Sequence, residues 1–112
     1  MKMEEREKTY IQRMIEYCDR IIAAKERFGE AYEHFLNDAD YRDVVCMNLF
    51  QIGELANQIS DEIRENFQDI PWNKMYGIRN ILAHAYIKID YKIIWETVIN
   101  DISELREKLM EI

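Results

Sequence analysis

Three reactive side chains and an amide lie close together near residue 80. The segment reads Arg79-Asn80-Ile81-Leu82-Ala83-His84-Ala85-Tyr86, and it contains one of only two histidines in the chain. Arginine offers a permanently charged fork for two phosphate oxygens, and histidine exchanges protons near neutral pH. Together with a phenol and an amide, these are the groups needed to handle a phosphodiester without a metal ion.

The spacing of these residues predicts a helix with one apolar side. At about 100° per residue, Tyr86 falls about 20° from Arg79, and Ala83 falls about 40° away on the other side. Asn80 and His84 follow at about 100° and 140°. The remaining side of the helix carries only apolar residues, namely Ile78, Ile81, Leu82 and Ala85. We therefore expect one buried face and one polar face.

The polar face suits metal-free cleavage of RNA, in which the ribose 2′-OH attacks the neighbouring phosphorus. His84 is suited to acid–base work and Arg79 to binding phosphate. Asn80 precedes His84 by four residues, so it could orient the imidazole or hold a phosphate oxygen. The ring of Tyr86 could stack on a base, or its hydroxyl could contact phosphate. Acid and base roles usually need two groups, and a two-fold dimer would supply His84 twice.

The same residues resemble a known family. The pattern R-N-x-x-x-H-x-Y follows Ile70-Pro71-Trp72 and Gly77 and precedes Asp90 and Trp95, while Gln51-Ile52-Gly53-Glu54 stands on an earlier helix. Together these elements resemble the HepT-like branch of the HEPN superfamily over roughly residues 8 to 106. The combination is more specific than the Arg–x4–His pair alone, which recurs by chance.

The resemblance implies a small all-helical dimer whose two motifs share a cleft. Many members are metal-independent endoribonuclease toxins, encoded beside a minimal nucleotidyltransferase antitoxin. Carried over to this chain, Arg79 and His84 would be catalytic. The nucleotidyltransferase would silence the toxin by adenylylating the motif tyrosine, here Tyr86. The implied partners are RNA, the nucleotidyltransferase and a second copy of the chain.

Two other interpretations remain open. The bundle could be a non-catalytic module that docks a nucleotidyltransferase or presents its substrate, with the motif binding nucleotide phosphate. Alternatively, the arginine, asparagine, histidine and tyrosine could form a structural network in a purely dimerising bundle. The gene beside this one would discriminate between them.

Three further charged residues are candidates for supporting roles. Glu54 stands among apolar positions, where a carboxylate must be paired, so it could hold Arg79 from a neighbouring helix or remain an ordinary surface glutamate. Lys74 and Lys88 could guide RNA, or be ordinary surface lysines. The net charge is −7, which argues against general nucleic-acid binding. The stretch from 71 to 95 is nevertheless net positive, because it contains four basic residues and a single acidic one.

Composition and periodicity predict an all-α fold in one domain spanning residues 1–112. Three glycines and one proline leave little material for β-turns. Amphipathic patterns predict four long helices and one short helix in an antiparallel four-to-five-helix bundle. The resemblance implies that this bundle is HEPN-like and dimeric. The expected boundaries are a stop near Gly29, caps at Asp38 or Asp40 and at Asp90, a bend at Ser60-Asp61, and a single last helix after Asp90. No apolar leader or membrane span is evident, so we expect a cytoplasmic protein.

No cofactor or metal is expected. The sequence has no Cys/His cluster with zinc spacing, and no HExxH or Walker motif. Cys18 and Cys46 both stand at apolar positions of helical patterns, which predicts reduced thiols in the core.

Overall fold

The computed structural model describes residues 2–84 and 88–112, and all regular structure in these ranges is helical. Four longer helices and three shorter ones follow one another within these two ranges. Their bounds are α1 Glu5–Phe28, α2 Tyr32–Asn37, α3 Ala39–Gln58, α4 Asp61–Asn66, α5 Trp72–His84, α6 Tyr91–Asn100 and α7 Ile102–Met110. The predicted all-α class is confirmed.

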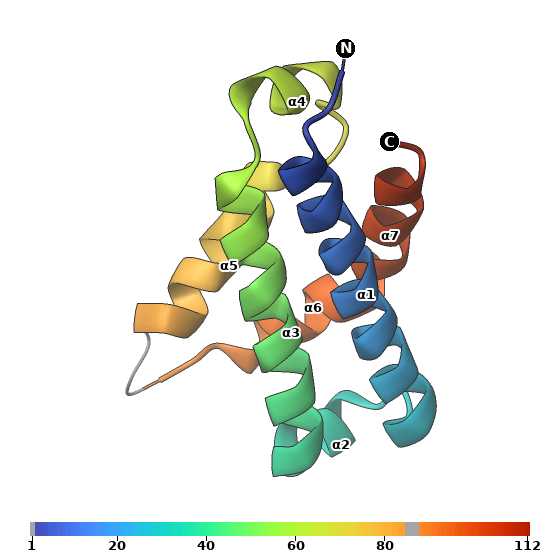
Figure 1. Cartoon of the computed structure of the whole chain (residues 1–112). Helices are drawn as coiled ribbons and strands as arrows, with labels where there is room; N and C mark the ends of the chain where they lie inside the picture. The colour runs from blue at the N-terminus through green and yellow to red at the C-terminus, as the bar shows by residue number, and fades with distance from the viewer. Residues whose placement is uncertain (1, 85–87) are drawn as a thin grey trace.

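Helix α3 lies at the centre of the bundle (Figure 1). It packs against α1 on one side and α5 on the other, and α7 packs against the far side of α1. Neighbouring helices in this row run in opposite directions, while α6 crosses behind them (Figure 1). The short helix α2 joins the ends of α1 and α3 and also contacts α6. Helix α5 therefore lies at the end of this row, with α3 as its neighbour.

Local capping chemistry sets several of the helix boundaries. Asp38 caps α3 by accepting hydrogen bonds from the N–H groups of Asp40 and Tyr41, and Asp90 caps α6 by accepting from Lys92 N. Side-chain oxygens at such positions satisfy N–H groups that have no partner inside the helix. Gly29 ends α1 with a φ of 92°, a conformation that favours glycine. These three predicted boundaries are confirmed.

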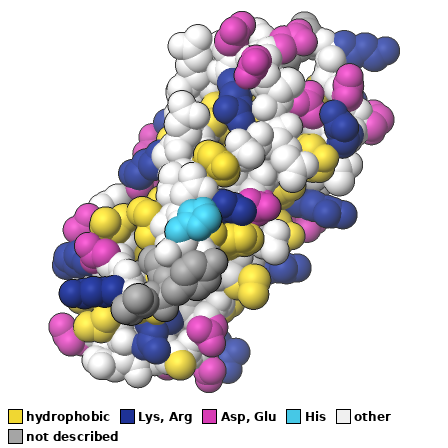
Figure 2. All heavy atoms as spheres, turned by 90° about the vertical axis from the view of Figure 1, so that its left-hand side faces the viewer, with side chains coloured by type: hydrophobic (Ala, Val, Ile, Leu, Met, Phe, Trp, Pro, Cys, Tyr) yellow, Lys and Arg dark blue, Asp and Glu magenta, His cyan; other side chains and the backbone are white. Residues whose placement is uncertain are grey.

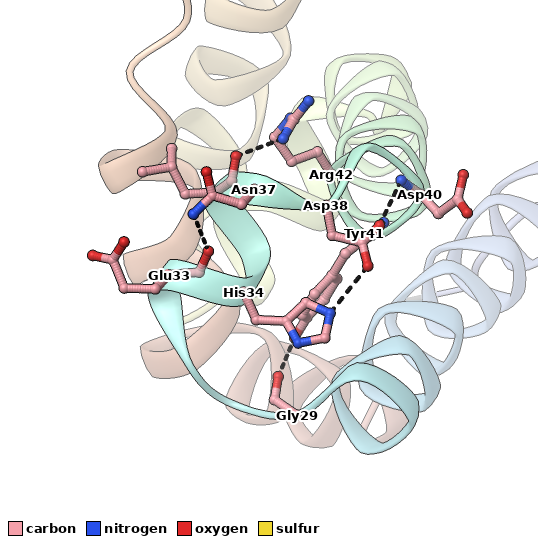
Figure 3. A network of polar contacts seen from close by, with 9 residues as sticks. Gly29, Glu33, His34, Asn37, Asp38, Asp40, Tyr41 and Arg42 are labelled. Atoms are coloured by element: carbon pink, nitrogen blue, oxygen red, sulfur yellow. Dashed lines mark hydrogen bonds and ion pairs between the residues drawn. The ribbon is translucent and has the colours of Figure 1, made fainter.

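Figure 3 shows the corner where α1, α2 and α3 meet. Tyr41 is fully buried, and its hydroxyl donates to the carbonyl of Gly29 at 2.7 Å. His34 Nε2 lies 3.0 Å from Asp38 Oδ2. The hydrogen bond from His34, followed by that from the Tyr41 N–H, holds the pKa of Asp38 below its ordinary value. The second histidine, His34, therefore pairs with the residue that caps α3, and this pair lies on the exposed surface.

The prediction of a single last helix is wrong. The chain breaks at Asp101, whose backbone lies at φ −116° and ψ −30°, and α7 begins at the next residue. Asn100 and Asp101 are weak helix formers because their side chains compete for backbone hydrogen bonds. Lys74 Nζ of α5 also holds the Asp101 carboxylate, at 2.6 Å. The break allows α6 to cross behind the bundle while α7 turns back along α1.

The two cysteines lie on the inner sides of their helices, as the apolar patterns predicted. Cys18 is fully buried, Cys46 is half-buried, and both are free. Burial raises the pKa of Cys18 to about 12 and that of Cys46 to about 11. Both therefore remain protonated core residues at neutral pH. No helix in the described part of the chain is long and apolar enough to span a membrane.

Candidate active site

Arg79 lies on α5 at the point where this helix comes closest to α3. The close approach depends on Gly53, because a Cβ built there would lie 2.3 Å from Arg79 Cβ and 2.7 Å from the carbonyl oxygen of Met75. No side chain fits in that space. The glycine of the Gly53-Glu54 pair therefore sets the distance between the two helices that position the arginine.

Two polar neighbours hold the guanidinium. Arg79 Nε is fully buried and is in ion-pair contact with Glu54 Oε1, although its N–H does not have the alignment of a hydrogen bond. Arg79 Nη1 donates to Asn80 Oδ1 at 3.0 Å. Glu54 thus pairs with Arg79 from the neighbouring helix, one of its two predicted arrangements. Asn80, by contrast, was expected to orient His84 or hold a phosphate oxygen, and in the structure it contacts the arginine.

Two aromatic rings also lie near Arg79. Its Cζ lies 5.1 Å from the centroid of the Phe50 ring and 5.9 Å from that of Tyr76. Both distances are within the range of cation–π attraction. Neither residue was predicted from the sequence to belong to the site. The available signal was helical spacing, since Tyr76 precedes Arg79 by three residues and Phe50 precedes Glu54 by four.

One nitrogen of the guanidinium, Nη2, is not engaged by these contacts. Over residues 2–84 and 88–112, neither a hydrogen bond nor an ion pair engages Nη2. The five N–H donors of arginine point in fixed directions, so anchoring Nε and Nη1 fixes the direction of the Nη2 donors. The Arg79 side chain is 23% exposed. A partly exposed guanidinium whose orientation is fixed in this way suits a phosphate oxygen.

His84 is the last residue of α5 and is exposed. It follows Arg79 by five residues, about 7.5 Å further along the helix axis. Figure 2 shows the face on this side of the molecule, where a histidine adjoins a basic and an acidic side chain among hydrophobic ones. Helix α5 thus carries a partly exposed arginine and ends at an exposed histidine.

The remaining predicted site residues are placed differently. Tyr86 lies outside the described residues. Lys74 is paired with Asp101 of the α6–α7 junction, so the structure does not bring it to Arg79. Lys88 is exposed just before α6 and lines a pocket between α2 and the start of α6. In the described ranges, no group of three or more histidine, cysteine or acidic side chains is arranged to hold a metal ion.

The described residues form an all-α bundle in which one helix carries Arg79 and ends at His84. Comparison with known families then assigns the chain to one of them. The chain belongs to the Ribonuclease HepT-like family, whose sequence profile matches residues 9–112.

Individual relatives are similar over most of their length. A protein of Caldanaerobacter subterraneus named "Putative RNase TTE0752" is 31% identical over 92% of this chain and 90% of its own. Another, from Methanocaldococcus jannaschii and named "Putative RNase MJ1380", is 37% identical over 70% of this chain and 72% of its own. The "Probable ribonuclease HepT" of Thermococcus cleftensis is 33% identical over 83% of this chain and 89% of its own. No solved structure matches the chain.

Proposed function

We propose that this protein is a metal-independent endoribonuclease and the toxin of a toxin–antitoxin pair with a minimal nucleotidyltransferase. The observation that carries the proposal is Arg79, held by Glu54 and Asn80 on the same helix as the exposed His84. The family and the names of the relatives support the class of activity. The residue roles follow from the chemistry of phosphodiester cleavage.

In the proposed reaction, the ribose 2′-OH attacks the adjacent phosphorus and the 5′-oxygen leaves. One His84 removes the proton from the 2′-OH, and a second, protonated His84 gives a proton to the leaving oxygen. Arg79 stabilises the negative charge on the phosphorane oxygens. The products are a 2′,3′-cyclic phosphate and a 5′-hydroxyl. The reaction thus needs two histidines, one from each copy of a homodimer.

The surface around Arg79 supports pairing of two copies. On α3, Met47 is 62% exposed and lies one turn before the half-buried Phe50. Tyr76 on α5 is also half-buried. Apolar side chains that surround a polar motif are typical of surfaces that become covered. A second copy on this face would bring the two motifs together and exclude water from the guanidinium groups.

Purified protein tests the proposal. We expect a dimer by light scattering, and cleavage of single-stranded RNA but not DNA in the presence of EDTA. Strict dependence on Mg²⁺ or Mn²⁺ would rule out the proposed mechanism. A monomer that cleaves RNA at full rate would rule out the shared site. A dimer that binds the nucleotidyltransferase and cleaves no RNA would favour the non-catalytic module.

Tyr86 is proposed as the residue through which the nucleotidyltransferase silences the enzyme. Its phenol oxygen would attack the α-phosphate of ATP, releasing pyrophosphate and leaving AMP on the tyrosine. The added phosphate brings negative charge and bulk to the motif that binds RNA. We expect this negative charge to compete with the RNA phosphate for Arg79.

We expect Tyr86→Phe to retain RNA cleavage and to escape silencing. The measurement is intact mass after incubation with the cognate nucleotidyltransferase and ATP. The wild type should gain mass in multiples of AMP, and Tyr86→Phe should gain none. Tyr76→Phe is the matched control, since it removes another phenol near Arg79 and should still be modified. Adducts that persist on Tyr86→Phe, or inhibition without any adduct, would contradict covalent silencing at this residue.

Glu54 is proposed as a positioning residue that acts through Arg79. We expect Glu54→Ala to lower the rate of cleavage by about 10- to 100-fold, because small displacements of a phosphate-binding group are costly. The free energy of unfolding should change by only about 0–1 kcal/mol, as for other partly exposed ion pairs. Glu54→Gln, which retains the length and an acceptor oxygen, should recover part of the rate. The exposed Glu96 provides the control, and equal rates for Glu54→Ala and Glu96→Ala would contradict the role.

A further inference from the structure

A second concave site lies where the chain resumes after the motif. It is a pocket of about 440 Å³ between α2 and the start of α6, lined by Tyr32, Leu36, Lys88, Ile89, Asp90 and Tyr91. Its volume is within the range of about 300–1,000 Å³ found for small-molecule sites. Two aromatic rings, two aliphatic side chains, one cation and one carboxylate form this lining, and the proposed cleavage reaction uses none of them.

The aromatic rings of the pocket are held in place and flanked by positive charge. Lys92 Nζ lies 4.6 Å from the centroid of the Tyr32 ring, and Arg42 Cζ lies 5.4 Å from that of Tyr91. Arg42 is itself fixed by donating to the carbonyl of Leu36, the bond at the end of α2 in Figure 3. Aromatic side chains combined with cations are the usual elements of single-strand nucleic-acid binding.

The pocket also lies close to the proposed site of cleavage. His84 and Lys88 are four residues apart, so their Cα atoms are separated by about 14 Å at most, whatever path the chain takes. A base in the pocket would therefore lie within a few nucleotides of a phosphate held at Arg79 and His84. On this overall acidic chain, three basic residues surround the pocket, namely Arg42, Lys88 and Lys92.

Asp90 is the carboxylate of the pocket lining. Its Oδ1 accepts from Lys92 N and caps α6, and within residues 2–84 and 88–112 no hydrogen bond or ion pair engages Oδ2. A carboxylate repels phosphate but accepts a hydrogen bond from the exocyclic amino group of cytosine or adenine. Uracil has the ring of cytosine but carries a carbonyl oxygen in place of the amino group.

We infer that this pocket binds a base of the RNA substrate that carries an exocyclic amino group, within a few nucleotides of the cleaved phosphate. The inference rests on the proposed ribonuclease function and adds a determinant of sequence preference. The base contacts the two tyrosines and donates to Asp90, while the adjoining phosphates lie outside the pocket beside Lys88 and Lys92.

The test measures the binding of short oligocytidylate and oligouridylate to the His84→Ala variant, which binds RNA without cutting it. We expect oligocytidylate to bind about 5-fold or more tightly than oligouridylate, because a matched hydrogen bond to a base edge discriminates by at least about 1 kcal/mol. Adding Asp90→Asn should bring the ratio of the two affinities to one or below. Asparagine retains the helix cap but can present its amide N–H group where aspartate presents an acceptor.

Ring removal tests the contact with the tyrosines. Tyr32→Leu and Tyr91→Leu should each weaken oligocytidylate binding by about 5-fold or more, the scale of losing one aromatic–base contact. Tyr17→Leu is the matched control, because Tyr17 also lies beneath an arginine, at 5.4 Å, but does not line the pocket. If a tyrosine variant fails to fold by circular dichroism, Lys88→Ala replaces it. Lys88 is exposed. Its replacement should reduce the slope of the logarithm of the binding constant against the logarithm of the salt concentration by about 0.7.

Unchanged binding in the pocket variants, or an unchanged ratio in Asp90→Asn, would overturn the inference. The proposed function would still stand if the wild type cleaves RNA in the same experiment. If the wild type cleaves no RNA and His84→Ala binds neither oligonucleotide, the ribonuclease proposal itself fails, and the pocket assignment fails with it.

Discussion

Replacing His84 with alanine should lower the rate of RNA cleavage by about 10²- to 10⁴-fold, the contribution typical of a general acid or base. In the proposed dimer one substitution removes both the base and the acid, so the upper part of that range is expected. His84 is exposed at the last position of α5. Its loss should therefore leave helix content and thermal unfolding unchanged, as measured by circular dichroism beside a single-turnover cleavage assay.

His34→Ala is the matched control, because it removes the other histidine of the chain from a corner built by α1, α2 and α3. It should cleave RNA at the wild-type rate. Arg79→Ala should lose about 10²-fold or more. If His84→Ala instead unfolds the protein while its folded fraction remains fully active, the motif is a structural network.

Gly53→Ala should destabilise the protein strongly, although it adds only one methyl group. The new Cβ would lie 2.3 Å from Arg79 Cβ and 2.7 Å from a backbone oxygen of α5, so α3 and α5 must move apart. Overpacking of this kind typically costs about 1–3 kcal/mol. The same displacement moves Arg79, so cleavage should fall even in the folded fraction. Urea unfolding and a cleavage assay measure the two effects.

Gly77→Ala provides a matched control on the same pair of helices. Gly77 lies within α5, is exposed, and an added Cβ would meet nothing within 4 Å. Alanine is a better helix former than glycine, so the free energy of unfolding of this variant should rise by about 0.5–1 kcal/mol. The variant should also retain activity. Both substitutions receive the same gain in helix propensity. The difference between their free energies of unfolding therefore measures the steric cost at Gly53. Equal stability of the two variants would show that the helices do not depend on close approach at Gly53.

The helix boundaries predicted from sequence depend on local chemistry. Asp38 and Asp90 cap the helices that follow them, and Gly29 ends α1, because each signal acts within a few residues. The break at Asp101 was missed because the apolar pattern continues through it from α6 into α7. Its ion pair with Lys74 involves residues that are far apart in the sequence. The same pair explains why the structure does not bring Lys74 to Arg79.

The candidate site was predictable in residue type but not in arrangement. Helical spacing identified the polar face bearing Arg79 and His84, and burial chemistry indicated that Glu54 needs a partner. The register of α3 against α5 decides that Phe50 and Tyr76 flank the guanidinium and that Asn80 contacts it. This register depends on packing between helices, and local sequence patterns do not reveal it. The pocket between α2 and α6 likewise combines segments that only the fold brings together.

The most direct test of the proposed mechanism is the chemistry of the cleaved ends. A single-stranded RNA is incubated with the protein in EDTA, beside a copy that carries one 2′-deoxynucleotide at the main cleavage site. We predict 2′,3′-cyclic phosphate and 5′-hydroxyl ends from the all-RNA strand, and no cleavage at that site in the substituted strand. The Arg79→Ala, His84→Ala double variant should produce neither product. Ends that carry a 5′-phosphate, cleavage at the deoxy position, or full activity of the double variant would contradict the mechanism.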